Sequence, residues 1–431
     1  MVRDTFLLAG AKGLYFMKHF SVIFFILFLT NLSFAKMDLP ELEAKMWNYI
    51  LHQQVDDNHV VRTEGGWPTY SRFRYSNIQS RESNSFVTSQ LLVALGPFGK
   101  KYHFLNFEGV ANRANLFLKK YVEDARKTAE PEGTIAYWPL LQTSSGKWIR
   151  SFSTKFPYNR LKTFNVPNDL DASANYFMWV HLNREDESYL HSFVKAVGDY
   201  LDKDREVLHP NDKRWKSAHS GAFLTWVDDD KVINPKTRIY KGINDVDCVV
   251  NLNILTALLT YKNSYGEIPL KSEFGLKASC KLMNETIFSR NAGICGVWYD
   301  RPSQFYTAYS KAYEAQGDFS CLEDSVEAAR EDILKRAKDT LKIMGKGRYT
   351  EIAEYISVIK KLISPSDRTP SESQLLLKLE KKLKEGIISQ GEVAFVKSTD
   401  SLFMTSLGLI TVDWYSQEFS TAIALEALLL D

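Results

Sequence analysis

The sequence predicts an all-α fold, an α/α toroid in which an inner ring of helices is covered by an outer ring. Helical segments that are apolar on nearly every face alternate along the chain with helical segments that have one charged face. A helix that is apolar all round is buried on all sides, whereas an amphipathic helix keeps one face in water. No linker rich in glycine, serine or proline divides the chain after residue 35, so we expect one domain from 36 to 431.

The two kinds of segment can be assigned in chain order. We expect buried helices at 86–95, 170–182, 246–259 and 419–430, and amphipathic helices at 110–127, 188–205, 322–342 and 351–362. An irregular helical bundle is the alternative arrangement of the same segments. Few stretches alternate with the period of a strand, and 408–413 is expected to form a small strand or turn before the last helix.

The segment from about 321 to 386 is dense in lysine and glutamate. Within it, Thr369-Pro370-Ser371-Glu372 is a capping box with proline at the first helical position, and Gly386 is placed to end that helix. Runs of charge such as Lys381-Lys382 usually mark a solvated face. We therefore interpret this segment as outer helices or a surface insertion without a function of its own.

The N-terminal 35 residues have the order of a secretory signal peptide. Lys18 and His19 are basic, 20–32 is apolar, and Ser33-Phe34-Ala35 offers small residues for cleavage. The apolar run is shorter than the roughly 18 residues that span a bilayer, so an uncleaved anchor is the less favoured alternative. We expect Met17 to be the true start, 1–16 not to be translated, and the mature protein to be periplasmic or secreted.

Composition excludes some functions. The net charge is +2 and 25% of residues are charged, so the chain is no bulk polyanion binder and we expect no nucleic-acid partner. Contact with membrane is expected only during export. Four cysteines allow three disulfide pairings in an oxidising compartment, and neither their spacing nor that of the histidines fits a zinc site. They are Cys248, Cys280, Cys295 and Cys321. The oligomeric state stays open.

A short repeat marks the starts of two buried helices. Asn168-Asp169-Leu170-Asp171 and Asn244-Asp245-Val246-Asp247 both read Asn-Asp-apolar-Asp before an apolar run. One Asp would suffice as a helix cap. Because inner helices of a toroid start at one mouth, we predict that these carboxylates converge there, with Asp171 and Asp247 as acid/base candidates and Asp169 and Asp245 tuning them. Calcium binding at the Asp cluster, or capping alone, are the alternatives.

Two motifs carry a resemblance to a known superfamily. Gln142-Thr-Ser-Ser-Gly146-Lys-Trp148 matches the Gln-x-x-x-Gly-x-Trp repeat of terpenoid cyclases, and 295–298 keeps its Gly-x-Trp part. The segment 169–172 is similar to the Asp-x-Asp-Asp motif of squalene–hopene-type cyclases, with Ala172 in place of the last Asp. The chain thus resembles the terpenoid cyclase and protein prenyltransferase toroids. The resemblance implies an α/α toroid and Asp171 as the proton donor.

Aromatic and basic residues fall in apparent loops before the inner helices, as expected of a ligand-binding cleft. The stretch at 64–68 is similar to a Gly-Gly-Trp-Pro stretch in one group of toroid pectate lyases. We predict an exported enzyme, hydrolase or lyase, that acts on a glycan or other polymer. A non-catalytic protein that binds a glycan or small molecule, and a diverged cyclase, remain alternatives. The candidate substrate-binding residues are Trp67, Tyr70, Arg72, Tyr137, Trp138, Trp298 and Tyr299.

Overall fold

The structure is a computed structural model of the chain. It describes residues 40–55, 64–73, 79–128, 130–142, 145–146, 148–150, 167–202, 207–208, 216–217, 221–227, 246–295, 298–299, 301–343, 348–397, 403–407 and 410–430. The chain divides into two compact units, Met1–Pro40 and Glu41–Asp431, and only Pro40 of the first is described. The predicted signal peptide and start at Met17 lie outside the described residues and stay predictions.

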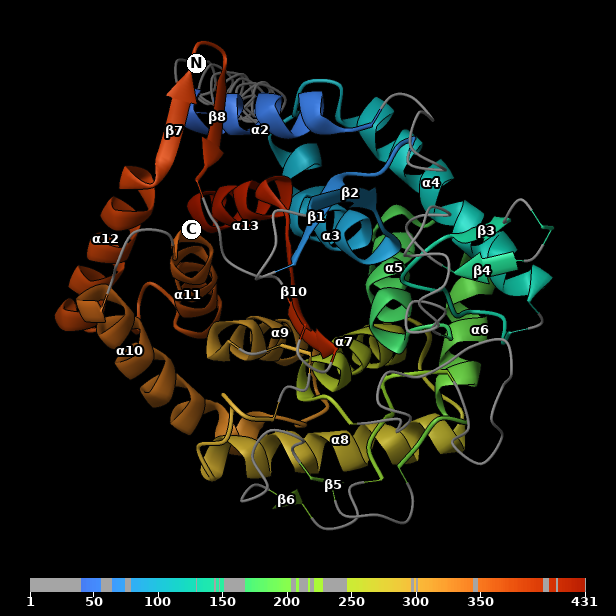
Figure 1. The fold of residues 1–431 in the computed structure, drawn as a ribbon. Helices are drawn as coiled ribbons and strands as arrows, with labels where there is room; N and C mark the ends of the chain where they lie inside the picture. Colours follow the sequence, from blue (N-terminus) through green and yellow to red (C-terminus); the bar gives the residue numbers. More distant parts are fainter. Residues whose placement is uncertain are drawn as a thin grey trace, which may run out of the picture. The chain divides into compact units, whose positions relative to one another are not determined.

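The helices of the second unit form the expected α/α toroid. The inner ring consists of α3 (Ser85–Lys101), α5 (Leu170–Asn183), α7 (Cys248–Tyr265), α9 (Pro302–Ala315), α11 (Tyr349–Leu362) and α13 (Gln417–Leu429). Each of these packs against the next, and α13 packs against α3, so the ring is closed (Figure 1). The outer layer consists of α2 (Glu41–Gln53), α4 (Phe107–Lys127), α6 (Glu187–Val197), α8 (Leu270–Phe288), α10 (Val326–Ile343) and α12 (Pro370–Glu385).

Burial explains which helices are inner. Almost every side chain of α5, α7 and α13 is buried, because these helices lack a polar face and contact neighbours on all sides. Helix α6 is amphipathic as expected but ends at Val197, where Gly198 caps it, rather than at 205. Helix α12 begins with the predicted capping box at Thr369 and ends at Gly386, as expected.

The prediction for 351–362 was wrong. Helix α11 is an inner helix between α9 and α13, although its charges suggested an outer one. These charges are paired across the ring: Arg301 donates to Glu354 at 3.1 Å, and Lys361 donates to Glu426 on α13 at 2.8 Å. The segment 321–386 therefore contains the outer helices α10 and α12 and the inner helix α11, and it is not a surface insertion. Inner helix α9 had not been predicted at all.

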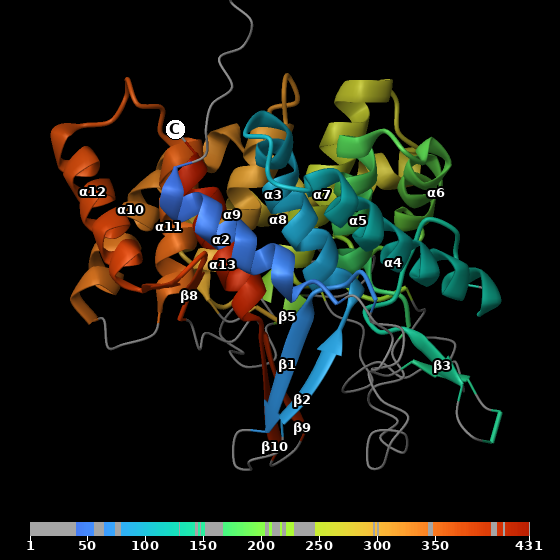
Figure 2. The same ribbon diagram turned by 90° about the horizontal axis from the view of Figure 1, so that it is seen from above.

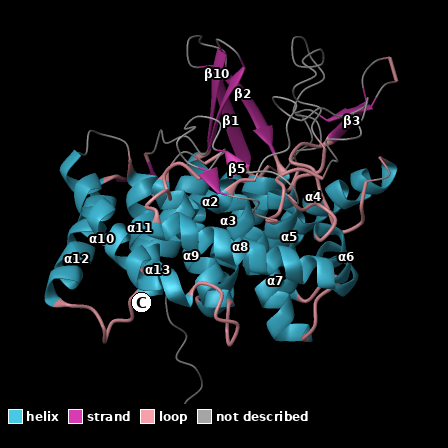
Figure 3. Cartoon of the chain, turned by 90° about the horizontal axis from the view of Figure 1, so that it is seen from below, coloured by secondary structure: helices cyan, strands magenta, loops and turns pink. Residues whose placement is uncertain are grey.

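A four-stranded antiparallel sheet stands on one side of the helical layers (Figures 2 and 3). Its order is β2 (Gln79–Ser83), β1 (Pro68–Phe73), β10 (Ile410–Tyr415) and β9 (Phe403–Leu407). Since β2 leads directly into α3 and β10 into α13, the sheet rises from the mouth where those inner helices begin. For 408–413, where a small strand or turn was expected, strand β10 begins at Ile410 and ends at Tyr415. The rest of the sheet had not been foreseen.

The described structure also contains a short 3-10 helix at Glu323–Ser325, three two-stranded hairpins and two disulfides. The hairpins pair β3 (Leu140–Gln142) with β4 (Trp148–Arg150), β5 (Val207–Leu208) with β6 (Lys216–Ser217), and β7 (Ile387–Gln390) with β8 (Val393–Val396). Of the three possible pairings, the cysteines adopt Cys248–Cys295 and Cys280–Cys321. None of the described helices combines the length and the apolar character needed to cross a membrane.

Candidate active site at the mouth of the toroid

The repeat at the starts of α5 and α7 has a different register from the one predicted. Asp169 is the N-cap of α5 and accepts hydrogen bonds from the backbone N–H groups of Asp171 and Ala172. Asp247 is the N-cap of α7 and accepts in the same way from Val249 and Val250. Asp247 is therefore the counterpart of Asp169 and not of Asp171. Asp245 lies outside the described residues.

Asp171 has no capping task and is held by side chains instead. Its side chain is 3% exposed. One carboxylate oxygen accepts from the amide of Asn253 on α7 at 2.6 Å and from the amide of Asn175 at 3.2 Å. The other accepts from the hydroxyl of Tyr299, just before α9. Two successive inner helices, α5 and α7, and the segment that leads into α9 thus meet at this carboxylate.

The electrostatics of these carboxyl groups differ from those of exposed aspartates. Burial raises the pKa of the Asp171 carboxyl to about 6, with the charge of Asp247 adding to the effect and the bond from Tyr299 opposing it. Burial and the neighbouring Asp171 raise the pKa of Asp169 well above its usual value. Burial and the same carboxylates keep the pKa of Tyr299 far above 10, so this hydroxyl remains a donor.

Both carboxylate oxygens of Asp247 accept hydrogen bonds from backbone N–H groups. Its first carboxylate oxygen caps α7 and its second accepts from the backbone N–H of Trp298 at 2.8 Å. The side chain is completely buried. These bonds hold the connection into α9 against the start of α7, beside the Cys248–Cys295 disulfide. We therefore assign Asp247 a positioning task for Trp298 and Tyr299, and do not retain it as an acid/base candidate.

A second buried carboxyl group lies where β2 meets α3. The indole of Trp138 donates to both oxygens of Glu82, at 3.3 and 3.2 Å, and the amide of Asn84 donates at 3.4 Å. Burial raises the pKa of Glu82 to about 8, so it is protonated at neutral pH. Asn84 also donates to the hydroxyl of Tyr137, whose pKa is raised by burial and by both Glu82 and Asp171.

A pocket opens in the middle of the ring, next to the side chains that hold Asp171. Asn253 and Tyr299, which bind Asp171 directly, are part of its wall. Phe86 packs against Tyr299 with ring centroids 6.2 Å apart. The remaining lining combines apolar side chains with amides and charges, namely Gln90, Val249, Gln304, Thr307, Ala308, Lys311, Glu354, Phe419 and Ile423. A ligand in this pocket would lie next to the Asp171–Tyr299 pair.

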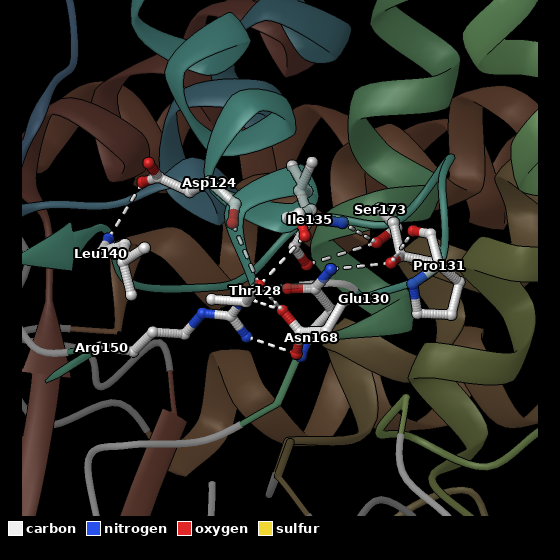
Figure 4. A network of polar contacts seen from close by, with 11 residues as sticks. Asp124, Thr128, Glu130, Pro131, Ile135, Leu140, Arg150, Asn168 and Ser173 are labelled. Atoms are coloured by element: carbon white, nitrogen blue, oxygen red, sulfur yellow. Dashed lines mark hydrogen bonds and ion pairs between the residues drawn. The ribbon is translucent and has the colours of Figure 1, made fainter. Parts of the chain in front are cut away.

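A network of buried polar groups fixes the start of α5 (Figure 4). Arg150, at the end of β4, donates to the carboxylate of Glu130 at 2.7 Å and to the hydroxyl of Thr128 at 3.0 Å. Glu130 in turn accepts from the backbone N–H of Asn168 at 3.1 Å, and Asn168 donates to Thr134 at 2.7 Å. The hairpin and the segment after α4 thereby determine where Asp169 and Asp171 stand.

The predicted aromatic residues lie in different surroundings. Tyr137, Trp138 and Tyr299 lie around Glu82 and Asp171, as described above. Trp298 is half-buried and meets Trp226 edge to face at 5.5 Å. Trp67 is fully buried and its indole donates to the carbonyl of Ile50 at 2.9 Å, so it belongs to the core.

The other predicted contacts lie on the sheet and the hairpin. Tyr70 on β1 stacks on Tyr415 with ring centroids 5.5 Å apart. The backbone of Arg72 pairs with Asp413, but its side chain lies outside what is described. The cyclase-like motif forms the β3–β4 hairpin, where Gln142 donates to the carbonyl of Gly146 and Trp148 is 49% exposed. The hairpin contacts the end of α4 and, through Glu130, the start of α5. The resemblance to cyclases is supported only at the level of the α/α toroid.

Within the described part of the chain, no group of three or more His, Cys, Asp or Glu side chains is arranged to hold a metal ion. Asp171 is instead surrounded by amide and hydroxyl donors. Calcium at the predicted Asp cluster stays untested, because Asp245 is outside the described residues.

Sequence reasoning missed Glu82, Asn175, Asn253, Gln90 and Lys311. A signal existed for three of them: Gln90, Asn175 and Asn253 are amide side chains within predicted helices that are mostly apolar. A buried polar side chain requires a partner, so its presence in such a helix points to a site. Glu82 and Lys311 carried no such local signal, because their surroundings come from distant parts of the chain.

The comparisons with known proteins support the fold of this chain and not its activity. No protein-family model and no curated protein matches the sequence. A solved structure of a protein from Actinoplanes matches with a TM-score of 0.51 and 11% identity, over 90% of this chain and 97% of that one. An unsaturated glucuronyl hydrolase specific for heparin matches with a TM-score of 0.46 and 11% identity, over 90% and 94%. The first likeness shows a common fold only, and the second is too low to support an argument.

Proposed function

We propose that the protein is an enzyme that cleaves a glycan at the mouth of the toroid, with Asp171 as its proton-transferring group. The observation that carries this proposal is the environment of Asp171. It is a buried carboxyl that caps no helix, is hydrogen-bonded to Asn253 and Tyr299 of the pocket wall, and has a pKa of about 6. A group that titrates close to neutral pH can both donate and accept a proton during one reaction cycle.

The neighbours of Asp171 suit this task. Asn253 and Asn175 fix one carboxylate oxygen, which leaves the second directed to Tyr299 at the pocket wall. A protonated Asp171 can donate to the oxygen of a scissile glycosidic bond, either directly or through the Tyr299 hydroxyl. Glu82, which stays protonated up to about pH 8, is the second carboxyl of this mouth.

The alternatives are weaker on particular observations. A cyclase of the terpenoid type would need an apolar cavity around Asp171, but Lys311 and Glu354 place two charged groups in the wall of this otherwise largely apolar pocket. A purely binding protein is favoured by the use of Asp169 and Asp247 as helix caps. A purely binding protein has no need for a buried aspartate that caps no helix and has a raised pKa, because such a group lowers the stability of the fold.

We further propose that the protein acts outside the cytoplasm, after cleavage behind Ala35. The basic, apolar and small-residue order of 18–35 supports export. The engagement of all four cysteines in disulfides supports an oxidising compartment. N-terminal sequencing of the protein recovered from the culture medium or periplasm tests this, and a mature protein that begins at Met1 or Met17 would contradict it.

The enzymatic proposal is tested with Asp171→Asn and a matched control. Purified protein is incubated with a panel of neutral and uronate-containing glycans, and new reducing ends and unsaturated products are measured. Asp171→Asn should lower the rate on the cleaved glycan by about 10²- to 10⁴-fold. Asp186→Asn should not, because Asp186 caps outer helix α6 and does not line the pocket. Equal rates for wild type and Asp171→Asn would refute the assignment, and binding without cleavage would favour the binding protein.

A further inference from the structure

Two polar side chains in the wall of the pocket form no hydrogen bond within the described part of the chain. Lys311 on α9 and Gln90 on α3 both line it. Gln90 is only 8% exposed and Lys311 is half-buried. Within the described structure neither forms a hydrogen bond, and Lys311 forms no ion pair. Buried polar groups are nearly always bonded to protein, water or ligand.

The other charged groups near Lys311 are already paired. Arg301 and Ser303 bind Glu354, at 3.1 and 2.5 Å, and Lys361 binds Glu426 at 2.8 Å. Glu314 lies 3.9 Å from the Lys361 ammonium. Burial lowers the pKa of Lys311, and the carboxylates of Glu426, Glu314 and Glu354 counteract this only from a longer range. Among the described groups of this cluster, Lys311 is thus the cation whose direct partner is missing.

We propose that this pocket is a subsite for an anionic substituent of the substrate, a carboxylate or a sulfate, which Lys311 and Gln90 bind. An ammonium group offers a compact positive charge with several donor hydrogens, and the Gln90 amide adds a further donor. Such charge-assisted hydrogen bonds are stronger than neutral ones. The inference rests on the proposed function and deepens it, because it names the substrate class as an acidic glycan.

The position of the pocket fits this role. Asn253 and Tyr299 belong to its wall and also bind Asp171, so a sugar ring whose anionic group reaches Lys311 would present its other side to Asp171. Phe86 and Phe419 supply apolar faces in the same wall. One charged anchor with apolar surroundings is the usual composition of a small-molecule site.

The test measures binding, so that it does not depend on cleavage. Methyl glucuronoside, glucose 6-sulfate and methyl glucoside are titrated calorimetrically into wild-type protein and into Asp171→Asn, which is expected not to turn over. We expect at least one of the two anions to bind and the neutral glycoside to bind at least about 10-fold more weakly. Whichever anion binds more tightly identifies the substituent.

Three variants assign the effect to the pocket. Lys311→Met should weaken anion binding by about 10- to 100-fold and leave any binding of the neutral glycoside unchanged. Gln90→Glu should abolish anion binding, because it places a carboxylate in the same wall. Lys338→Met, on the exposed face of outer helix α10, is the matched control and should bind as wild type does.

A stability measurement separates a ligand-binding lysine from a structural one. Lys311→Met should melt higher than wild type, because it removes a half-buried charge that has no direct partner among the described residues. The proposal is overturned if neither anion binds, if all three ligands bind alike, or if Lys311→Met binds anions as wild type does. If the anions bind through Lys311 but no glycan is cleaved, the subsite stands and the enzymatic proposal fails.

Discussion

Replacement of Asp171 by asparagine should stabilise the protein, with a characteristic pH dependence. Burial raises the pKa of Asp171 from 3.8 to about 6 in the folded protein. The sign follows from linkage: the unfolded chain loses this proton first, so the wild-type free energy of unfolding decreases as pH rises from about 4 to 6 and then stays level. At about 1.4 kcal/mol per pKa unit, ionisation costs the fold about 3 kcal/mol at pH 8.

Asn can occupy the site without a new clash. Its amide oxygen can accept from Asn253 and Asn175, and its amide nitrogen can donate to the Tyr299 oxygen once that hydroxyl has turned away. Unfolding entropy is about 2 cal/mol/K per residue, or roughly 0.8 kcal/mol/K over 41–431, so 3 kcal/mol corresponds to about 4 °C in melting temperature. The gain should appear at pH 8 and shrink towards pH 4.

The matched variant is Asp247→Asn, the same chemical change at the next inner helix. Its oxygen can still cap α7, but its amide would face the N–H of Trp298, and one buried bond would be lost. We expect a loss of about 1–3 kcal/mol. Urea unfolding of wild type and both variants between pH 4 and 8 measures these differences. A pH-independent effect of Asp171→Asn, or a stability change of the same sign in both variants, would refute the reasoning.

Further predictions concern activity, two buried ion pairs and a disulfide. If protonated Asp171 is the donor, the rate of glycan cleavage should fall as pH rises above about 6; a pH–rate profile that stays level up to pH 8 would argue against this. Arg150→Met should cost about 3–5 kcal/mol in urea unfolding, because Glu130 is left buried and unpaired; a loss under 1 kcal/mol would show that the network in Figure 4 does not hold the α5 start. Lys361→Met should destabilise by a similar amount through Glu426, in contrast to the gain for Lys311→Met; equal signs would contradict the assignment of partners. The double change Cys280→Ser and Cys321→Ser should lower the free energy of unfolding by about 2–4 kcal/mol. Non-reducing peptide mapping of this variant should recover only the Cys248–Cys295 bridge. In the wild type, any peptide that links other pairs would disprove the connectivity.

The sequence was sufficient for features that depend on local pattern. The apolar character of α3, α5, α7 and α13 identified four inner helices, because no face of these segments tolerates water. The capping box at Thr369 and the glycine at 386 likewise act through bonds within a few residues. The toroid itself followed from the alternation of the two kinds of helix.

Tertiary structure decided the features that depend on distant partners. Glu354 and Lys361 suggested a solvated helix, but Arg301 and Glu426 neutralise them and allow α11 to line the ring. Asp171 and Asp247 occupied equivalent places in the written repeat. Only the packing of α5, α7 and the Tyr299 segment gives Asp171 side-chain donors and leaves Asp247 to the backbone. Periodicity reports which face of a helix is apolar; it does not report which charge from another helix lies opposite.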